Sequence, residues 1–428
     1  MHVTAMDVID LSGQLTELVV SWTGEPPRRD LPVAFNQGNH LRAQQLGRGA
    51  WLAGTVELPG AANDPAKVAT AVERFLGEHD ALRARFTVGD HPRQDVFEPD
   101  QVSVRPRLVG RVWHSFVTSL INERCHAGRV PGLFFGLLGS TLVCAFDHAH
   151  ADALTIDLVL RRMAELYADP DSAARPGEDF AERCCAEDGT GSILADLTAE
   201  RRAELMGVWQ DFFAATDGAL PAFPIPLGEG RDPQHTTVIH ILDADAAETA
   251  LSSRPFATIL AELAAAVADA GGPDRLATLI PIHTRGGSRS GWHNTAGWMV
   301  SNAPVVVEAG NPDSADAWLR HAAGLSTLPL EQVLAECAPQ FVSEDIFMVS
   351  YLDYRKLGPA LPGAQHISAV TSTDTAQLWF SRGHHGLELR VRYPARPAAD
   401  AVIGTVIDGL VRRLRPGGTV VDMRVRAS

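Results

Sequence analysis

The sequence predicts an α/β (α+β) protein made of two mixed halves. Its 428 residues exceed one ordinary domain, and two domains of about 200 residues each are the default for this length. Strand-like and helical patterns occur in both halves, and a break rich in Pro, Gly, Asp and Glu lies between them, within residues 170–235. We therefore expect a first domain over residues 1–175, a linker with an amphipathic helix over 176–235 and a second domain over 236–428.

The first half contains four clear patterns. Residues 51–60 (WLAGTVELPG) alternate and end in Pro-Gly, which is typical of a strand followed by a turn. Asp64 is placed to cap a helix over 65–79, with a proline just inside its start. Residues 83–88 (RARFTV) predict a short strand, and the continuous apolar run over 140–146 (STLVCAF) predicts a buried one.

The second half alternates in the same way. The linker helix is expected over residues 194–216, and further helical patterns occur near 247–271, 314–339 and 398–415. Strand-like runs occur at 237–242, 303–308, 346–352, 376–381 and 386–393.

Composition excludes several function classes. Hydrophobic residues make up 45% of the chain and charged residues 21%, as in an ordinary globular protein with a large core. The formal net charge of -15 argues against a nucleic-acid binder and against adhesion to an anionic membrane. The five cysteines are odd in number and contain no C-x-x-C, so we expect reduced thiols and a cytoplasmic location. With no signal-peptide pattern and no apolar run of about 18 residues, we expect no membrane span.

The stretch FDHAHADAL (146–154) connects the predicted buried strand to a predicted helix over 154–169. It has two interpretations. His148, His150 and Asp152 would start a metal site, or His148 and Asp152 alone would act as a base with a structural acid. A zinc site needs three or four ligands, and candidates elsewhere, such as His235, His240 and His283, have no recognisable frame. The pattern H-x-H-x-D-H resembles the metallo-β-lactamase family, but Ala153 stands where its closing histidine would be.

The same residues resemble the H-H-x-x-x-D-G motif of the chloramphenicol acetyltransferase-like superfamily, which includes nonribosomal peptide condensation domains. His148 and Asp152 match its catalytic histidine and its aspartate, whereas Asp147 stands in the first histidine place and Ala153 in the glycine place. Two more segments are similar to family patterns in the right order: GEHDALRARF (77–86) and NTAGWMVSNAPVVV (294–307). The stretch AFNQGNHL (34–41) before WLAGTVELPG is most similar to stand-alone polyketide-associated (Pap-type) acyltransferases.

This resemblance implies two chloramphenicol acetyltransferase-like subdomains in a V-shaped pseudo-dimer with an active-site tunnel between them. It implies an acyltransferase of natural-product or lipid biosynthesis that joins an acyl thioester to a small-molecule alcohol or amine. His148 would be the general base, and Asp152 would form a structural salt bridge for which Arg83 is the candidate partner. Asn302 and Trp298 are candidate substrate-binding residues in the tunnel.

The implied donor is acyl-coenzyme A or a phosphopantetheinyl carrier protein, with no metal and no permanently bound cofactor. An acyl or peptidyl carrier protein is therefore an expected partner. A second hypothesis is a non-catalytic condensation-like domain that recruits other enzymes, because Asp147 and Ala153 depart from the motif. The presence of both His148 and Asp152 favours activity. The conservative alternatives are that Asp152 only caps a helix and that His148 is only structural.

Overall fold

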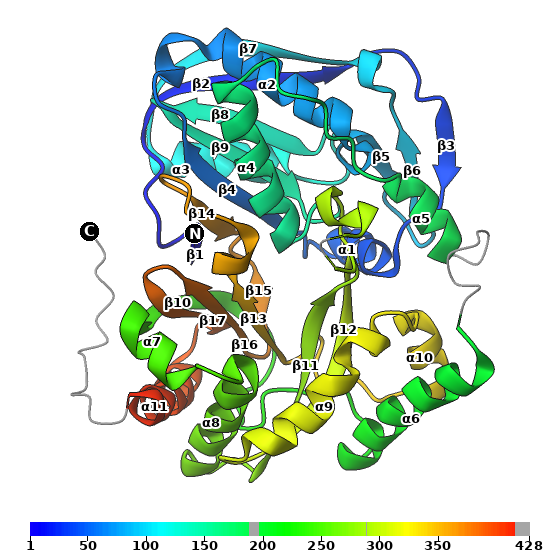
Figure 1. Cartoon of the computed structure of the whole chain (residues 1–428), viewed down its shortest axis with the longest axis vertical. Helices are drawn as coiled ribbons and strands as arrows, with labels where there is room; N and C mark the ends of the chain where they lie inside the picture. Colours follow the sequence, from blue (N-terminus) through cyan, green and yellow to red (C-terminus); the bar gives the residue numbers. More distant parts are fainter. Residues whose placement is uncertain (188–196, 288, 416–428) are drawn as a thin grey trace. The chain divides into compact units, whose positions relative to one another are not determined.

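The computed structural model describes residues 1–187, 197–287 and 289–415 (Figure 1). The chain forms two compact units. Unit 1 comprises Met1–Asp196, Arg285–Met299 and Pro359–Val370, and unit 2 comprises Leu197–Thr284, Val300–Gly358 and Thr371–Ser428. The boundary between residues 196 and 197 lies inside the expected linker, part of which (188–196) falls outside the described residues. Two short segments of the second half nevertheless belong to unit 1, so the units are not two continuous pieces of chain.

Unit 1 is built on a seven-stranded sheet with the order β1-β14-β4-β9-β8-β2-β7. Only the pairing of β1 with β14 is parallel. The strands of this sheet are β1 (His2–Ala5), β2 (Gly13–Trp22), β4 (Trp51–Glu57), β7 (Val102–Val112), β8 (Leu133–Leu138), β9 (Thr141–Asp147) and β14 (Gln365–Ser368).

The remaining elements of unit 1 surround this sheet. The helices are α1 (Phe35–Gln45), α2 (Pro65–Glu78), α3 (His114–Arg124), α4 (Ala153–Ala168) and α5 (Phe180–Glu187). The short 3-10 helices are η1 (Ala61–Asn63), η2 (Asp80–Arg83), η3 (Pro99–Gln101) and η4 (Gly291–Asn294). A second, three-stranded sheet has the order β3-β6-β5, formed by β3 (Arg28–Leu31), β6 (Arg93–Val96) and β5 (Ala84–Thr87).

Strand β9 contributes to two hydrophobic cores because successive side chains of a strand point to opposite faces. Leu142, Cys144 and Phe146 lie in the core that packs against α2 and α4. Val143 and Ala145 lie in the core on the other face, which includes residues of α3. A strand buried on both faces needs apolar residues throughout, so the apolar run over 140–146 correctly predicts a buried strand.

The helix starts of unit 1 also follow from sequence. The Asp64 carboxylate accepts a hydrogen bond from the Lys67 amide at 3.0 Å, and α2 begins at Pro65 as predicted.

Strand β4 packs closely against α4 because it carries Gly54. A Cβ at Gly54 would lie 2.7 Å from Ile156 Cγ2 and 2.9 Å from Leu160 Cδ1. Gly54 therefore determines how close α4 lies to the sheet.

Unit 2 is built on a second seven-stranded sheet with the order β12-β11-β13-β16-β17-β10-β15. Its strands are β10 (Asp232–Asp243), β11 (Arg275–His283), β12 (Val300–Glu308), β13 (Met348–Asp353), β15 (Ser372–Thr373), β16 (Gln377–Gly383) and β17 (Gly386–Pro394). Its helices are α6 (Ala199–Ala215), α7 (Ala244–Ala250), α8 (Pro255–Asp269), α9 (Pro312–Leu325), α10 (Leu330–Cys337) and α11 (Pro397–Leu414), together with the 3-10 helix η5 (Tyr354–Leu357). All five strand-like runs of the second half lie in or overlap strands.

Two long helical patterns of the second half are each divided into two helices. The pattern over 247–271 forms α7 and α8, and the pattern over 314–339 forms α9 and α10. Pro255 and Pro329 lie at the breaks. Proline lacks the amide hydrogen that a continuing helix needs and disfavours helical geometry in the preceding residue, so periodicity alone overestimates the helix length.

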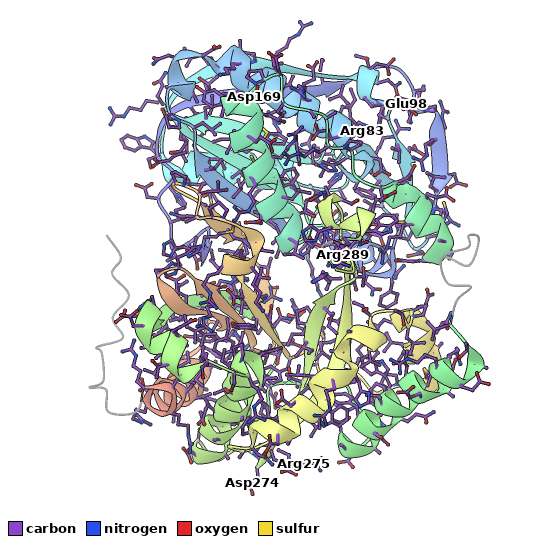
Figure 2. All side chains as sticks on the ribbon, in the orientation of Figure 1. Arg83, Glu98, Asp169, Asp274, Arg275 and Arg289 are labelled. Carbon is purple, nitrogen blue, oxygen red and sulfur yellow. The ribbon has the colours of Figure 1, made fainter. Side chains whose placement is uncertain are left out.

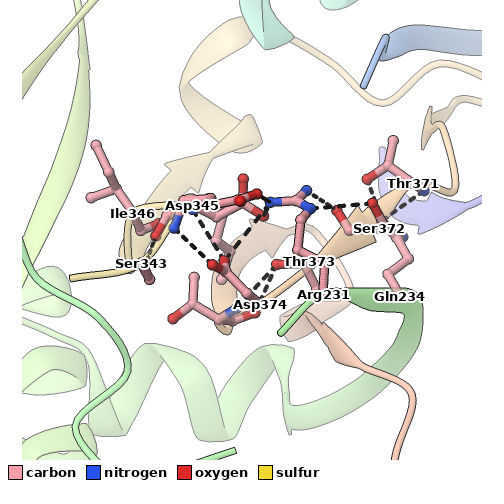
Figure 3. Close-up of polar contacts among 12 residues, drawn as sticks. Arg231, Gln234, Ser343, Asp345, Ile346, Thr371, Ser372, Thr373 and Asp374 are labelled. Atoms are coloured by element: carbon pink, nitrogen blue, oxygen red, sulfur yellow. Dashed lines mark hydrogen bonds and ion pairs between the residues drawn. The ribbon is translucent and has the colours of Figure 1, made fainter. Parts of the chain in front are cut away.

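Arg231 connects three segments of unit 2 (Figure 3). Its Nη2 donates to the Ser372 carbonyl at 2.6 Å, and its Nη1 lies 3.2 Å from Asp345 Oδ2. The Asp374 carboxylate in turn accepts from the amides of Glu344 and Asp345 at 2.7 and 3.1 Å. The Arg231 guanidinium thus connects the start of β10 to Ser372 of β15 and to Asp345, which precedes β13.

In the described part of the chain, no single helix has the length and apolar character needed to cross a bilayer; the bent pair α7 and α8 passes only when its two helices are counted together.

Substitution of Gly54 by valine should destabilise unit 1, because the added side chain would overlap Ile156 and Leu160 of α4. We expect the free energy of unfolding to fall by about 1–3 kcal/mol, measured by chemical denaturation. Gly207→Ala in α6 is the control, since a Cβ there meets nothing within 4 Å. An unchanged unfolding midpoint for Gly54→Val would contradict this account of the α4 position.

Candidate active site

The predicted motif lies on a strand-to-helix turn of unit 1. Strand β9 ends at Asp147 and α4 begins at Ala153, so residues 148–152 form the connection. Backbone hydrogen bonds hold its start: the His148 amide donates to the Ala50 carbonyl at 3.0 Å, and the Asp147 amide donates to the Gly132 carbonyl at 3.0 Å. Backbone hydrogen bonds therefore hold the first residues of the turn at the end of a buried strand. Such a position suits the presentation of a catalytic side chain.

His148 is half-buried and stacks on Trp298, with 3.8 Å between ring centroids and 25° between ring planes. Its Nδ1 is buried and has no hydrogen-bond partner among the described residues, which leaves Nε2 as the nitrogen for proton transfer. Burial, reinforced by the nearby His40, lowers the pKa of His148 to about 4. The imidazole is therefore neutral at physiological pH and can accept a proton.

Both carboxylate oxygens of Asp152 accept hydrogen bonds from residues of unit 1. Its carboxylate forms a bidentate ion pair with Arg285, with Nη1–Oδ2 at 2.6 Å and Nη2–Oδ1 at 2.9 Å. It also accepts from the amides of Thr155 at 2.8 Å and Met299 at 3.0 Å. Burial alone would raise the pKa of Asp152, but Arg285 and the two amides bring the pKa below its usual value. Asp152 thus caps α4 and forms a salt bridge at the same time.

The prediction that Arg83 pairs with Asp152 is wrong. The Arg83 guanidinium, labelled within unit 1 in Figure 2, donates instead to the carbonyls of Leu76 at 2.6 Å, Gly77 at 2.8 Å and Phe97 at 2.8 Å. Leu76 and Gly77 are in the last turn of α2, where helix carbonyls have no partner within the helix. Arg83 therefore has a local structural role at the end of α2.

The actual partner, Arg285, lies 133 residues from Asp152 in sequence. No local pattern marks it, since its charge differs in no visible way from those of neighbouring arginines. Arg285 also donates to the carbonyls of Thr295 at 3.1 Å and Gly297 at 3.0 Å. It therefore closes the segment 285–299 into a loop, and this loop carries Trp298 to the His148 ring.

The other candidates have separate places. Trp298 lies in unit 1 directly against His148, so its proposed substrate contact would be beside the base. Asn302 belongs to unit 2, on β12 opposite Pro281 of β11. Its Oδ1 is buried without a hydrogen-bond partner in the described ranges, and its role in substrate binding stays a prediction.

The geometry does not support the metal interpretation of the motif. His150 Nδ1 lies 2.8 Å from the Ala81 carbonyl, and Asp152 is occupied by Arg285. Within the described residues, no group of three converging ligand atoms includes His148, His150 or Asp152. Two of the three candidates from farther along the chain, His235 and His240, pair with Asp400 and Asp243.

Sequence analysis did not identify a second imidazole near His148. His40 of α1 lies with its ring centroid 6.0 Å from that of His148, and its Nε2 donates to Asp147 Oδ1 at 3.0 Å. The stretch AFNQGNHL, which contains His40, signalled a family likeness, but no pattern in it assigned His40 to this place.

Known proteins similar in sequence are acyltransferases. The chain is 22% identical over 319 residues to acyltransferase PapA3 of Mycobacterium tuberculosis, covering 68% of this chain and 66% of that protein. It is also 22% identical over 325 residues to PapA1 of the same organism, a 2'-acyl-2-O-sulfo-trehalose (hydroxy)phthioceranyltransferase, covering 68% of this chain and 62% of PapA1. The chain thus spans slightly less than two thirds of the length of these relatives. No protein-family model matches it.

Solved structures with the same fold include the PapA2 acyl transferase, with a TM-score of 0.79, 18% identity and coverage of 97% of this chain and 99% of that one. The first condensation domain of the calcium-dependent antibiotic synthetase has a TM-score of 0.64 and 16% identity, covering 90% and 95%. The starter condensation domain of rhizomide synthetase, in complex with C8-CoA and Leu-SNAC, has a TM-score of 0.61 and 14% identity, covering 90% and 94%. The predicted mixed α/β fold is confirmed.

Removal of the Asp152 charge should destabilise the protein, because Asp152→Asn leaves the buried Arg285 without its counter-ion. We expect the free energy of unfolding at pH 7 to fall by roughly 3–5 kcal/mol. The double variant Asp152→Asn/Arg285→Met should lose less than the two single variants added together, as measured by a double-mutant denaturation cycle. Additive losses would show that the two groups are not coupled.

The exposed pair Arg254–Asp313 provides a control, since Asp313→Asn should leave the unfolding midpoint unchanged.

The stabilisation by Asp152 should also depend on pH in a defined direction. Since its pKa is lowered in the folded state, the contribution is present above the unfolded carboxyl pKa of about 3.9 and is lost as the pH falls through the folded value.

Proposed function

We propose that the chain is an acyltransferase of the chloramphenicol acetyltransferase-like superfamily, near its Pap-type members, and that it forms an ester from an acyl thioester and an alcohol. The observation that carries this proposal is a neutral, half-buried imidazole on a rigid turn: His148 follows a buried strand, and Asp152 and Arg285 fix the start of the helix after it. A neutral imidazole is the side chain best suited to move protons to and from a substrate near neutral pH.

In the proposed reaction, His148 Nε2 accepts the proton of the acceptor hydroxyl as its oxygen attacks the thioester carbonyl. A carbon–oxygen bond forms, the tetrahedral intermediate collapses, and the carbon–sulfur bond breaks. The imidazolium then returns its proton to the thiolate. With a His148 pKa of about 4 and a free-thiol pKa of about 8.5, this last transfer is strongly favourable. The products are an ester and a free thiol, with the imidazole restored.

The proposed donor is an acyl-coenzyme A or an acylated carrier protein. Support comes from the condensation-domain fold, one member of which is solved with C8-CoA bound. The proposed acceptor is an alcohol rather than an amine, because PapA1 is named for transfer to a trehalose derivative. An acceptor hydroxyl on a sugar or lipid is the class to test first. A small-molecule acceptor and a thioester donor require no metal in this scheme.

The two departures from the motif do not weaken the proposal. Ala153 is the first residue of α4 and is not among the residues with positive φ, so its backbone has no need of glycine. Asp147 is fully buried and hydrogen-bonded. A recruiting role without catalysis would leave the neutral imidazole of His148 with no chemical task, whereas Asp152 has its structural role in either case.

Substitution of His148 by alanine should abolish acyl transfer while preserving the fold, because the base is lost and the structural pair remains. We expect kcat to fall by about 10²–10⁴-fold, measured as thiol release from acyl-coenzyme A donors of increasing length with trehalose and simple alcohols as acceptors. The exposed His91→Ala is the matched control. Equal thiol release by wild type and His148→Ala would remove His148 from the mechanism.

The pH dependence of kcat/KM should reflect the lowered pKa of His148. The base acts when unprotonated, so activity is retained above its pKa and is lost below it. We expect a plateau from about pH 5.5 to 8 and an acid limb near pH 4, rather than near the ordinary imidazole value of about 6.5. The charged groups that face the ring are His40 of α1, Asp147 of β9 and Asp152 before α4. An acid limb near pH 6.5 in folded protein would contradict the buried environment.

A further inference from the structure

Helix α1 presents a polar face to the interior of unit 1. Gln37, His40 and Gln44 recur three and four residues apart, so they lie on one side of the helix. They are only 1%, 8% and 6% exposed. Burial of a polar side chain costs free energy unless it is hydrogen-bonded, so such a face is maintained only where it meets matching polar groups. Gln37 Oε1 accepts from the Ala34 amide at 2.8 Å, and the other matching groups lie at the end of β9 and in the motif turn.

The three side chains contact the residues on either side of His148. Gln37 Nε2 donates to the Ala149 carbonyl at 2.7 Å. His40 Nε2 donates to Asp147 Oδ1 at 3.0 Å, and Gln44 Nε2 donates to Asp147 Oδ2. Residues 147 and 149 are therefore both held by α1, while the residue between them presents its ring to Trp298.

Asp147 transmits this hold to the turn. Its Oδ1 also accepts from the Ala149 amide at 2.9 Å, so the carboxylate bridges α1 and the backbone just after His148. Burial would raise the pKa of Asp147, but the hydrogen bond and charge of His40 lower it, which keeps the acceptor ionised. An ionised carboxylate accepts from His40, Gln44 and Ala149 together, whereas a protonated one would lose an acceptor site.

We infer that His40 and Gln44 are positioning residues for His148: by holding Asp147, they fix the turn that aims the His148 imidazole at its substrate. This inference rests on the proposed function and deepens it, since it assigns the Asp147–His40 pair a role at the position where the motif departs from its usual histidine. His40 itself lies with its ring 6.0 Å from that of His148 and 5.9 Å from that of Trp298.

The helix offers a matched pair of variants to test this. Gln44 is buried on Asp147, and the adjacent Gln45 is the same residue type but exposed. We expect Gln44→Ala and His40→Leu to lower kcat by about 10–100-fold with the donor KM unchanged, because a small misplacement of a catalytic group costs up to about 10²-fold. Gln45→Ala should keep the wild-type kcat.

Rescue and pH then separate positioning from a merely structural role. Asp147→Asn keeps an acceptor for His40 and Ala149 and should retain most of the kcat that Asp147→Ala loses. The acid limb of kcat/KM should also move in opposite directions. In His40→Leu the acid limb should shift to higher pH, because this variant removes a positive neighbour of His148. In Asp147→Asn it should shift to lower pH, because this variant removes a negative neighbour. His148, Asp152 and Trp298 are unchanged in both variants.

Two sets of outcomes distinguish this inference from the proposed function. If wild type turns over and His148→Ala does not, an unchanged kcat and acid limb in His40→Leu and Gln44→Ala would overturn the positioning role alone. If wild type shows no His148-dependent turnover, the proposed function fails, and hydrogen exchange of the peptide over 146–152 decides the inference. Faster exchange in His40→Leu and Gln44→Ala than in Gln45→Ala supports it, and equal exchange overturns it.

Discussion

The buried ion pair between Asp152 and Arg285 is the interaction on which the rest of the site depends. Each side chain is 3% exposed, so the pair must offset the cost of removing two charges from water. The bidentate geometry does this together with the amides of Thr155 and Met299. A single carboxylate thereby starts α4, ends the motif turn and anchors the loop that places Trp298 against His148. Among the described residues of unit 1, no other ion pair connects these three features.

The motif turn is held from two sides by different chemistry. On one side is the ion pair, with its charges fully compensated. On the other side is α1, which contributes neutral donors and one imidazole to the carboxylate of Asp147. His148 lies between these two anchored carboxylates, and both raise its basicity while burial and His40 reduce it. The resulting balance favours the neutral ring. It therefore depends on residues from α1, β9 and the segment 285–299, and not on the motif alone.

Sequence patterns predicted the parts of this arrangement that are local. The two-face burial of β9, the Asp64 cap of α2, the motif turn and the strands of unit 2 all follow from neighbouring residues. The parts that failed depend on distant contacts. The position of Arg83 suits the family motif, yet its guanidinium donates to the carbonyls of Leu76 and Gly77 instead. Helix α1 carries no apolar stripe because its buried face binds polar groups, so hydrophobic periodicity gives no sign of it. Pro255 and Pro329 divide two helical patterns that periodicity alone extends through them.

The composition of unit 1 has a consequence for how the protein is made. Residues 285–299 and 359–370 belong to this unit, and β14 (Gln365–Ser368) lies between β1 and β4 in its sheet. A ribosome that adds about 5–20 residues per second needs roughly 7–27 s to pass from Asp152 to Arg285, 133 residues later. Throughout that time the nascent chain has Asp152 without its partner and a sheet without one of its inner strands. Unit 1 therefore cannot be completed during translation of the first half. Its final assembly comes after most of unit 2 has been synthesised, although its first 196 residues emerge first.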